Sequence, residues 1–193
     1  MQKLLFALIL LCSSISLSAK TKELDLLANG RKLTYRISFN GEEYEYIVRI
    51  KKDNKSTSFD YSISGGSSIL SGFVSYQAKS KYVAADGMAI PGFSGAGTFE
   101  PYILIDFNTN NAITKAKYTD SIAVKVNKEN YKVTKGGSDG FNVGDDNDIR
   151  ALYCSLIQNE TSGELVLGAG VNKGIILDIN FGNKFKMRLV KVE

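Results

Sequence analysis

The chain has 193 residues, contains no histidine and carries a formal net charge of +4 at pH 7. The lack of histidine excludes Ser-His-Asp and Cys-His catalysis and almost all zinc, copper and non-haem iron sites, because these sites depend on imidazole. The lysines are mostly scattered, which does not fit the dense positive surface of a nucleic-acid-binding protein. We therefore expect a protein that is not an enzyme, holds no cofactor and binds no nucleic acid.

Residues 1–19 have the layout of a secretory signal peptide. Lys3 gives a basic start, Leu4 to Leu11 is an unbroken apolar run, and small residues follow as far as Ala19. The apolar run is too short to span a bilayer, and no later stretch is apolar enough for a transmembrane segment. We predict that residues 20–193 form one exported domain, located in the periplasm, at the cell surface or outside the cell.

The two cysteines are relevant to the prediction of a signal peptide and one exported domain. Cys12 follows the apolar run, but Leu10 and Leu11 stand where a lipoprotein signal generally needs small residues, so a lipoprotein is the less favoured interpretation. Cys154 is then the one cysteine of the exported domain, which excludes an intramolecular disulfide. We expect stability to come from burial and hydrogen bonding, with Cys154 as a small buried hydrophobic residue.

Residues 33–50 carry the clearest structural pattern of the chain. Apolar residues alternate with polar ones on both sides of Asn40-Gly41, which is the strongest short signal for a β-hairpin. A two-residue loop there places three apolar pairs on one face, namely Ile37 with Tyr44, Tyr35 with Tyr46, and Leu33 with Val48. The same register places Arg36 opposite Glu45 and Thr34 opposite Ile47 on the other face.

Two further strands are predicted after this hairpin. Residues 59–63 continue the alternation, and residues 69–76 read as a strand in which Gly72 indicates a bulge or bend. The pattern breaks between residues 77 and 101, where glycines and prolines permit at most a short helix near 78–85. Long irregular segments in a domain are often functional, and Phe93 lies in this one. Ser94 resembles a nucleophile-elbow serine, but no histidine exists to activate it.

The second half of the chain contains weaker patterns and one candidate metal site. Residues 102–107 and 149–158 are predicted strands, and 112–118 is either a strand or a short helix. Residues 121–126 and 131–134 are predicted to pair around a four-residue turn, and 136–148 reads as a polar loop. Three aspartates in that loop could bind calcium, but their spacing does not fit an EF-hand, so a solvated turn is favoured. They are Asp145, Asp146 and Asp148.

Residues 175–181 and 185–192 form a predicted closing hairpin. A three-residue loop at 182–184 would pair Ile179 with Met187 and Leu177 with Leu189 on one face and Asp178 with Arg188 on the other. The chain thus begins and ends in the same kind of hairpin. We predict an all-β fold, an antiparallel meander that forms a lipocalin-like barrel, a half-barrel or a curved sandwich, with one short helix or irregular segment near 78–100.

Two stretches resemble a group of uncharacterised secreted or periplasmic β-rich proteins of Bacteroidetes-type bacteria. The first comprises residues 33–35, 40–52, 58–61 and 71–72, and the second comprises residues 174–179 and 186–189. The likeness covers the first third and the last tenth of the chain, and the Gly-rich stretch 87–97 departs from it. It implies an exported β-rich domain and brings no activity and no catalytic residues.

The aromatic residues of the inward strand faces suggest a function. We expect a carrier that binds a small apolar or amphipathic ligand inside the barrel, lined by Tyr35, Tyr46, Tyr61 and Phe93, with the Gly-rich segment as a lid. The alternative is a structural or adhesive component of the cell envelope that has a solid core and binds another envelope protein at its outer face or at an edge strand. The enclosed volume distinguishes the two.

Overall fold

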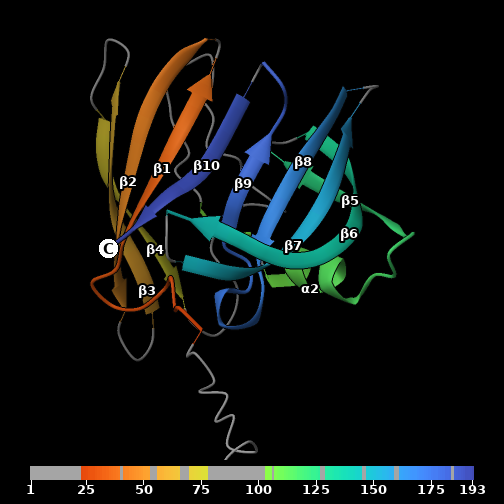
Figure 1. Cartoon of the computed structure of the whole chain (residues 1–193), viewed down its shortest axis with the longest axis horizontal. Helices are drawn as coiled ribbons and strands as arrows, with labels where there is room; N and C mark the ends of the chain where they lie inside the picture. Colours follow the sequence, from red (N-terminus) through yellow and green to blue (C-terminus); the bar gives the residue numbers. More distant parts are fainter. Residues whose placement is uncertain are drawn as a thin grey trace, which may run out of the picture.

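The computed structural model describes residues 23–39, 41–52, 56–65, 70–77, 103–105, 107–126, 129–144, 147–158, 161–183 and 185–193. Ten antiparallel strands form one sheet in the order β4-β3-β2-β1-β10-β9-β8-β7-β6-β5 (Figure 1). The strands are β1 (Lys32–Phe39), β2 (Glu42–Lys52), β3 (Ser56–Gly65), β4 (Leu70–Gln77), β5 (Ser121–Val126), β6 (Glu129–Val143), β7 (Asn147–Gln158), β8 (Thr161–Gly168), β9 (Ile176–Asn180) and β10 (Phe185–Val192). The helical elements are α2 (Phe107–Lys115) and the short 3-10 helix η1 (Gly170–Asn172).

This order confirms the predicted all-β antiparallel meander. Every pair of strands that is consecutive in the chain is adjacent in the sheet except β4 and β5, and the first strand pairs with the last. The order is that of an up-and-down barrel that is opened between β4 and β5, and the sheet is not closed. Pairing of β1 with β10 removes two edges, so β4 and β5 are the edge strands among the strands that the structure describes.

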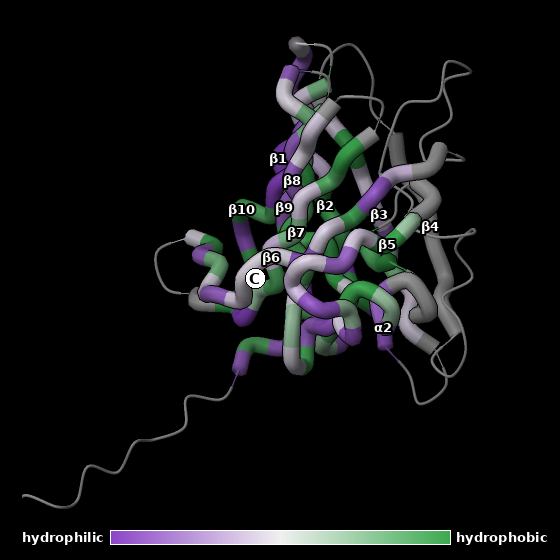
Figure 2. Tube along the Cα trace, turned by 90° about the vertical axis from the view of Figure 1, so that its right-hand side faces the viewer, coloured by the Kyte–Doolittle hydropathy of each residue, from purple (hydrophilic) through white to green (hydrophobic). Residues whose placement is uncertain are grey.

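The register predicted for the first hairpin is confirmed, and that of the closing hairpin is confirmed for two of its three predicted pairs. In the first, Ile37 pairs with Tyr44, Tyr35 with Tyr46, Leu33 with Val48, Arg36 with Glu45 and Thr34 with Ile47. In the closing hairpin, Met187 pairs with Ile179 and Arg188 with Asp178, and the Phe181 amide donates to the Phe185 carbonyl at 2.8 Å. Figure 2 shows hydrophobic and hydrophilic residues alternating along the strands, as expected for a sheet with one buried face.

Four details of the sequence prediction are wrong. The stretch 136–148, read as a polar loop, belongs largely to β6 and β7, and residues 129–130 pair with 125–126 instead of forming a four-residue turn. The predicted strand 102–107 is not formed in its described part, since Leu104 makes only an isolated bridge and α2 begins at Phe107, and α2 bears out the helical alternative for part of 112–118. The helix or irregular segment expected near 78–100 lies outside the described residues. Gly72 pairs with Tyr61 without a register shift, so it forms no bulge. The stretch 136–148 was misread because the bulge at Gly136 and Gly137 interrupts the alternation of β6, and the Gly, Asp and Asn residues of this stretch are typical of turns.

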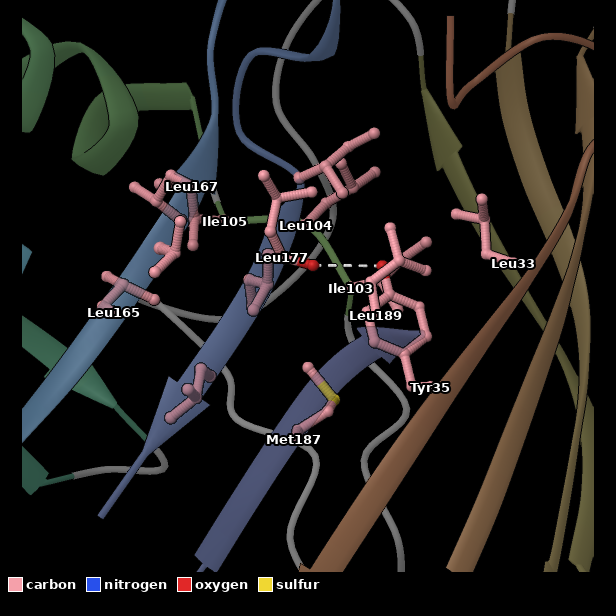
Figure 3. Packing of buried hydrophobic residues seen from close by; sticks show 14 of the residues in the cluster. Leu33, Tyr35, Ile103, Leu104, Ile105, Leu165, Leu167, Leu177, Met187 and Leu189 are labelled. Carbon is pink, nitrogen blue, oxygen red and sulfur yellow. Dashed lines mark hydrogen bonds between the residues drawn. The ribbon is translucent and has the colours of Figure 1, made fainter. Parts of the chain in front are cut away.

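The inner face of the sheet encloses the hydrophobic core. Tyr35, Tyr46 and Phe59 are among the largest fully buried side chains, and the Tyr35 hydroxyl donates to the Ile176 carbonyl at 3.0 Å. Residues 103–105 lie between the strands that carry Leu33 and Tyr35 and those that carry Leu165 and Leu177 (Figure 3). Ile176 donates its amide to the Ile103 carbonyl at 2.8 Å, so this segment is fixed to β9. A chain segment thus occupies space inside the curved sheet.

Asn172 fastens the N-terminal part of the domain to this core. Its side chain is fully buried in η1, accepts a hydrogen bond from the Leu26 amide at 2.8 Å and donates to the Leu24 carbonyl at 2.7 Å. Leu26 is itself fully buried. Because the oxygen and the nitrogen of the Asn172 side-chain amide both have hydrogen-bond partners, burial of this side chain stabilises the contact.

Candidate functional site

The β6–β7 hairpin changes its orientation at Gly136 and Gly137. The register between these strands shifts from Lys135–Cys154 to Ser138–Leu152, so two residues of β6 lie opposite the single residue Tyr153. Odd-numbered positions of β6 face the core before this bulge and the opposite side of the sheet after it. A bulge of this kind bends the strand and increases its twist.

Beyond the bulge the hairpin folds over the outer face of the sheet. We name this part, residues 138–144 and 147–152, the flap. Phe141, Val143 and Ile149 point to the outer side by register and yet are at most 2 % exposed. The guanidinium of Arg188, on β10, lies 4.6 Å from the centre of the Phe141 ring. Figure 1 shows the end of β6 crossing in front of β9, so the flap covers the neighbouring strands.

A groove of about 650 Å³ lies beside the flap on the outer face of the sheet. We name it the flap groove. It is lined by residues of β6 to β10, namely Thr134, Lys135, Gly136, Gly140, Phe141, Asn142, Tyr153, Cys154, Ser155, Glu164, Leu165, Val166, Asp178 and Arg188. Its volume is in the range of small-ligand sites.

Two carboxylates and one guanidinium form the charged part of this groove. Arg188 donates to Asp178 at 2.6 Å, and Asp178 has a side-chain exposure of only 19 %. Burial raises the pKa of Asp178, and the nearby Glu164 raises it further, while the hydrogen bond from Arg188 opposes both effects. Because Arg188 is held by Asp178 on one side and by Phe141 on another, its guanidinium is fixed before any ligand arrives.

The remaining surface of the groove is partly polar and partly apolar. Its apolar members Phe141, Leu165 and Val166 are 2 %, 0 % and 6 % exposed. Tyr153 is half-buried, and its hydroxyl donates to the Gly140 carbonyl at 2.8 Å, which fixes the ring. A ligand in the groove therefore meets polar atoms, apolar atoms and one tyrosine ring. The Lys135 ammonium group is already engaged, since it donates to the carbonyls of residues 114 and 116 at 2.9 and 3.3 Å.

A second groove of about 440 Å³ lies on the outer face of β1, β2 and β3. We name it the β1–β3 groove. Its lining comprises Thr34, Tyr35, Arg36, Glu43, Tyr44, Glu45, Ser64, Gly65 and Val190. The Tyr44 hydroxyl is hydrogen-bonded to the Glu42 carboxylate, and this bond is the main cause that raises the pKa of Tyr44. Within the described part of the chain, Arg36 forms no ion pair.

Among the described residues that were proposed from sequence, Tyr35 alone lines a groove, the β1–β3 groove, although its side chain is fully buried in the core. Tyr35 and Tyr46 are fully buried with ring centres 5.8 Å apart, and the half-buried Tyr61 lies 6.1 Å from Tyr46. Phe93 lies outside the described residues, as do Asp145 and Asp146. The backbone of Asp148 belongs to β7, opposite Asn142. Among the described residues, no group of three or more histidine, cysteine, aspartate or glutamate side chains could hold a metal ion.

The flap groove was missed because the stretch that forms its wall was read as a loop. The ion pair in its floor was predicted from the register of the closing hairpin. The sequence did contain one signal for the flap. A single polar residue separates Phe141 from Val143, and another separates Ile149 from Ala151, which is the alternation of a short strand.

Comparison with known proteins adds no relative. No protein-family model matches the chain, and no curated protein and no solved structure matches it significantly. A search for membrane-crossing helices among the described residues finds no helix with sufficient length and apolar character.

Proposed function

We propose that the protein is an exported, non-enzymatic binding component of the cell envelope, and that it recognises its ligand at the flap groove on the outer face of its sheet. The observation that carries this proposal is the groove itself. It has the volume of a ligand site, and it contains a guanidinium held in place by Asp178 and Phe141. Pre-organised polar groups in a concave surface bind ligands at a low entropic cost.

The described interior supports an outer rather than an inner site. Tyr35 and Tyr46 contact each other in the core, and the Tyr35 hydroxyl is bonded to the main chain of Ile176. Residues 103–105 are also buried there. These groups fill space that an apolar ligand would need. The carrier of a small apolar ligand therefore stays a prediction of the sequence, and the envelope component with a solid core is the function we favour.

Binding to envelope material tests the proposal directly. We would incubate the purified protein with an insoluble envelope preparation of the organism that encodes it and measure the sedimented fraction. Glu164→Arg reverses a charge at the exposed edge of the flap groove and is expected to abolish sedimentation. Lys173→Glu reverses an exposed charge that lies in neither groove and is expected to leave it unchanged. Equal sedimentation of the two variants would overturn the assignment of the groove.

Two measurements test the other parts of the proposal. N-terminal sequencing of the protein from the exported fraction is expected to begin directly after the predicted signal peptide, near Ala19. Mass spectrometry of an organic extract of the purified protein is expected to detect no stoichiometric apolar molecule. A bound lipid at one copy per chain would restore the carrier hypothesis. The protein is also expected to leave an envelope polysaccharide uncleaved, and release of new reducing ends would contradict the non-enzymatic assignment.

A further inference from the structure

We propose that the flap groove binds a basic side chain, a lysine or an arginine that belongs to another protein of the envelope. The charged end of this side chain lies at the carboxylates of Glu164 and Asp178, and its methylene stem lies on the apolar surface of the groove. This inference rests on the proposed function, because it names the ligand of the groove assigned there. Three features carry it: an excess of negative charge, a shallow apolar surface, and a backbone that is already paired.

The flap groove presents more negative than positive charge. Four charged residues line it, namely Lys135, Glu164, Asp178 and Arg188. The Lys135 ammonium group is bonded to two main-chain carbonyls at the C-terminal end of α2, on the core side of the sheet, so it does not balance a carboxylate in the groove. Arg188 is paired with Asp178. One carboxylate is therefore left without a counter-charge, and a cationic ligand is electrostatically complementary to it.

Glu164 is the carboxylate without a counter-charge. It is exposed on β8, between Ser155 of β7 and Asn180 of β9, and within the described part of the chain it forms no ion pair. Arg188 lies two strands away and two residues further along, which places it about 12 Å from Glu164 by strand spacing and rise. Lys186 also lies two strands away, with Asn180 between it and Glu164. A cation can therefore approach Glu164 from solvent without displacing another one.

Asp178 is affected by the same excess of negative charge. Burial raises the pKa of Asp178, and the charge of the nearby Glu164 raises it further. The two carboxylates therefore repel each other, and a cation placed between them lowers this repulsion. The strand order puts Asp178 on β9, between Glu164 on β8 and Arg188 on β10. The guanidinium of Arg188 thus lies on the side of Asp178 that faces away from Glu164.

The apolar surface of the groove is shallow. The groove exposes somewhat more apolar than polar surface, and yet Phe141, Leu165 and Val166 are at most 6 % exposed. It therefore has no deep pocket for the large apolar side chains that often anchor a partner. The stem of a lysine or an arginine needs only a shallow surface, because these side chains lay their methylene groups on apolar atoms and keep the charged end at a polar site.

The basic side chain must belong to a segment that is recognised through its side chains. Strands β7 to β10 each have a neighbour on both sides, so their amide and carbonyl groups are used in the ladders of the sheet and no peptide strand can add to them. An exposed ion pair alone contributes little, so a free amine is not expected to bind tightly. The groove volume of about 650 Å³ leaves room for the residues that flank the basic one.

Titration of the full protein with short peptides tests this inference. The probes are blocked pentapeptides in which a central arginine, lysine, citrulline or glutamate has two alanines on each side, and binding is followed by NMR chemical shifts. Citrulline keeps the shape of arginine without its charge. We expect the arginine and lysine peptides to bind at least about fivefold more tightly than the citrulline peptide, and the glutamate peptide to bind most weakly. The shifts are expected to map to the lining of the flap groove.

Two variants locate the charge that is recognised. Glu164→Gln keeps the size of the side chain and removes its charge, and it is expected to weaken binding of the arginine peptide about fivefold. Glu45→Gln is the matched control. Glu45 is an exposed carboxylate on β2, opposite Arg36 on the same outer face, and it does not line the flap groove. Its replacement is expected to leave binding unchanged.

The outcomes separate this inference from the proposed function. If the citrulline peptide binds as tightly as the arginine peptide, the groove does not recognise a basic group, and the inference is overturned. If Glu45→Gln weakens binding as much as Glu164→Gln, the effect is general electrostatics and the inference is again overturned. If no peptide binds while envelope sedimentation still depends on Glu164, only the assignment of a basic side chain falls. If neither peptide binding nor sedimentation depends on Glu164, both proposals fall.

Discussion

The β1–β2 and β6–β7 hairpins are both antiparallel strand pairs, but their apolar residues lie on different faces of the sheet. β1 and β2 keep one register from Lys32–Arg49 to Phe39–Glu42, and their apolar residues stay on one face. β6 and β7 change register at Gly136 and Gly137, and the apolar residues beyond the bulge turn to the opposite face. The apolar residues of the first hairpin therefore all pack in the core, whereas those of the second pack on both faces of the sheet. The bulge at Gly136 and Gly137 moved the apolar residues of the flap to the outer face, beside the flap groove.

The largest expected effect concerns the regular hairpin. Tyr35→Ala removes a large, fully buried ring and is expected to lower the free energy of unfolding by about 4 kcal/mol, through lost burial and the cavity left behind. Tyr35→Phe keeps the ring and removes only the bond to the Ile176 carbonyl, at a cost of about 1 kcal/mol. Urea unfolding measures both values. Equal losses in the two variants would mean that the ring does not pack as described.

A smaller loss is expected in the flap. Phe141→Ala removes a ring that is 2 % exposed and is expected to cost about 3 kcal/mol. Hydrogen exchange should show that protection is lost chiefly in residues 139–151 and retained in β1 and β2, because the flap packs on the far side of the sheet. Val171→Ala, at a site that is 55 % exposed, is the control and should change stability by less than about 0.5 kcal/mol. Uniform loss of protection would show that the flap and core unfold together.

The Cys154 side chain, on β7 beside the bulge, is buried in the core. Burial raises the pKa of its thiol to about 11, although the Gly136 backbone and Lys135 lower it somewhat. At pH 8 the thiolate fraction should therefore be about a hundredfold below that of a thiol with the ordinary pKa of 9.0. In a Cys12→Ser chain, alkylation by iodoacetamide is expected to be slow in buffer and fast in urea. Rapid alkylation of the folded protein would place Cys154 on the open side of the bulge.

The bulge itself can be tested with two neighbouring glycines. A Cβ at Gly136 would lie 2.8 Å from the Tyr153 carbonyl oxygen, so Gly136→Ala must displace backbone and is expected to cost about 2 kcal/mol. A Cβ at Gly137 would meet nothing within 4 Å, and Gly137→Ala is expected to change stability by less than about 0.5 kcal/mol. Thermal or urea unfolding compares the two variants. Equal costs would indicate that the strand crosses this point without the close approach to β7.

The smallest expected effect is a pH dependence at Asp178. Its pKa is raised in the folded protein, so the stabilising contribution is complete below the unfolded pKa near 3.8 and is lost as the pH rises through the folded pKa. Unfolding free energies of the native chain and of Asp178→Asn, measured from pH 3 to pH 7, should therefore diverge. The native chain is expected to lose stability relative to the variant as the pH rises. A relative gain would mean that Arg188 outweighs burial.

The sequence predicted the elements whose residues pair with near neighbours. The hairpin around Asn40-Gly41 and the Asp178–Arg188 pair followed from alternation and loop length, because a two- or three-residue loop leaves a single register that keeps apolar residues on one face. The ion pair in the floor of the groove was therefore accessible from sequence. The groove around this ion pair could not be predicted from sequence, because the sequence does not show which residues of the outer face are covered by the flap and which are exposed.

Only the tertiary structure decided what depends on distant contacts. The pairing of β1 with β10, the placement of residues 103–105 inside the sheet and the folding of the flap onto β10 all join segments that are far apart in the chain. Phe141 is covered by Arg188 of β10, which follows it in the chain, so the short local alternation around it does not show that the flap folds onto the sheet. The local alternation of side chains determined the strands, and long-range packing determined which of their faces became the candidate site.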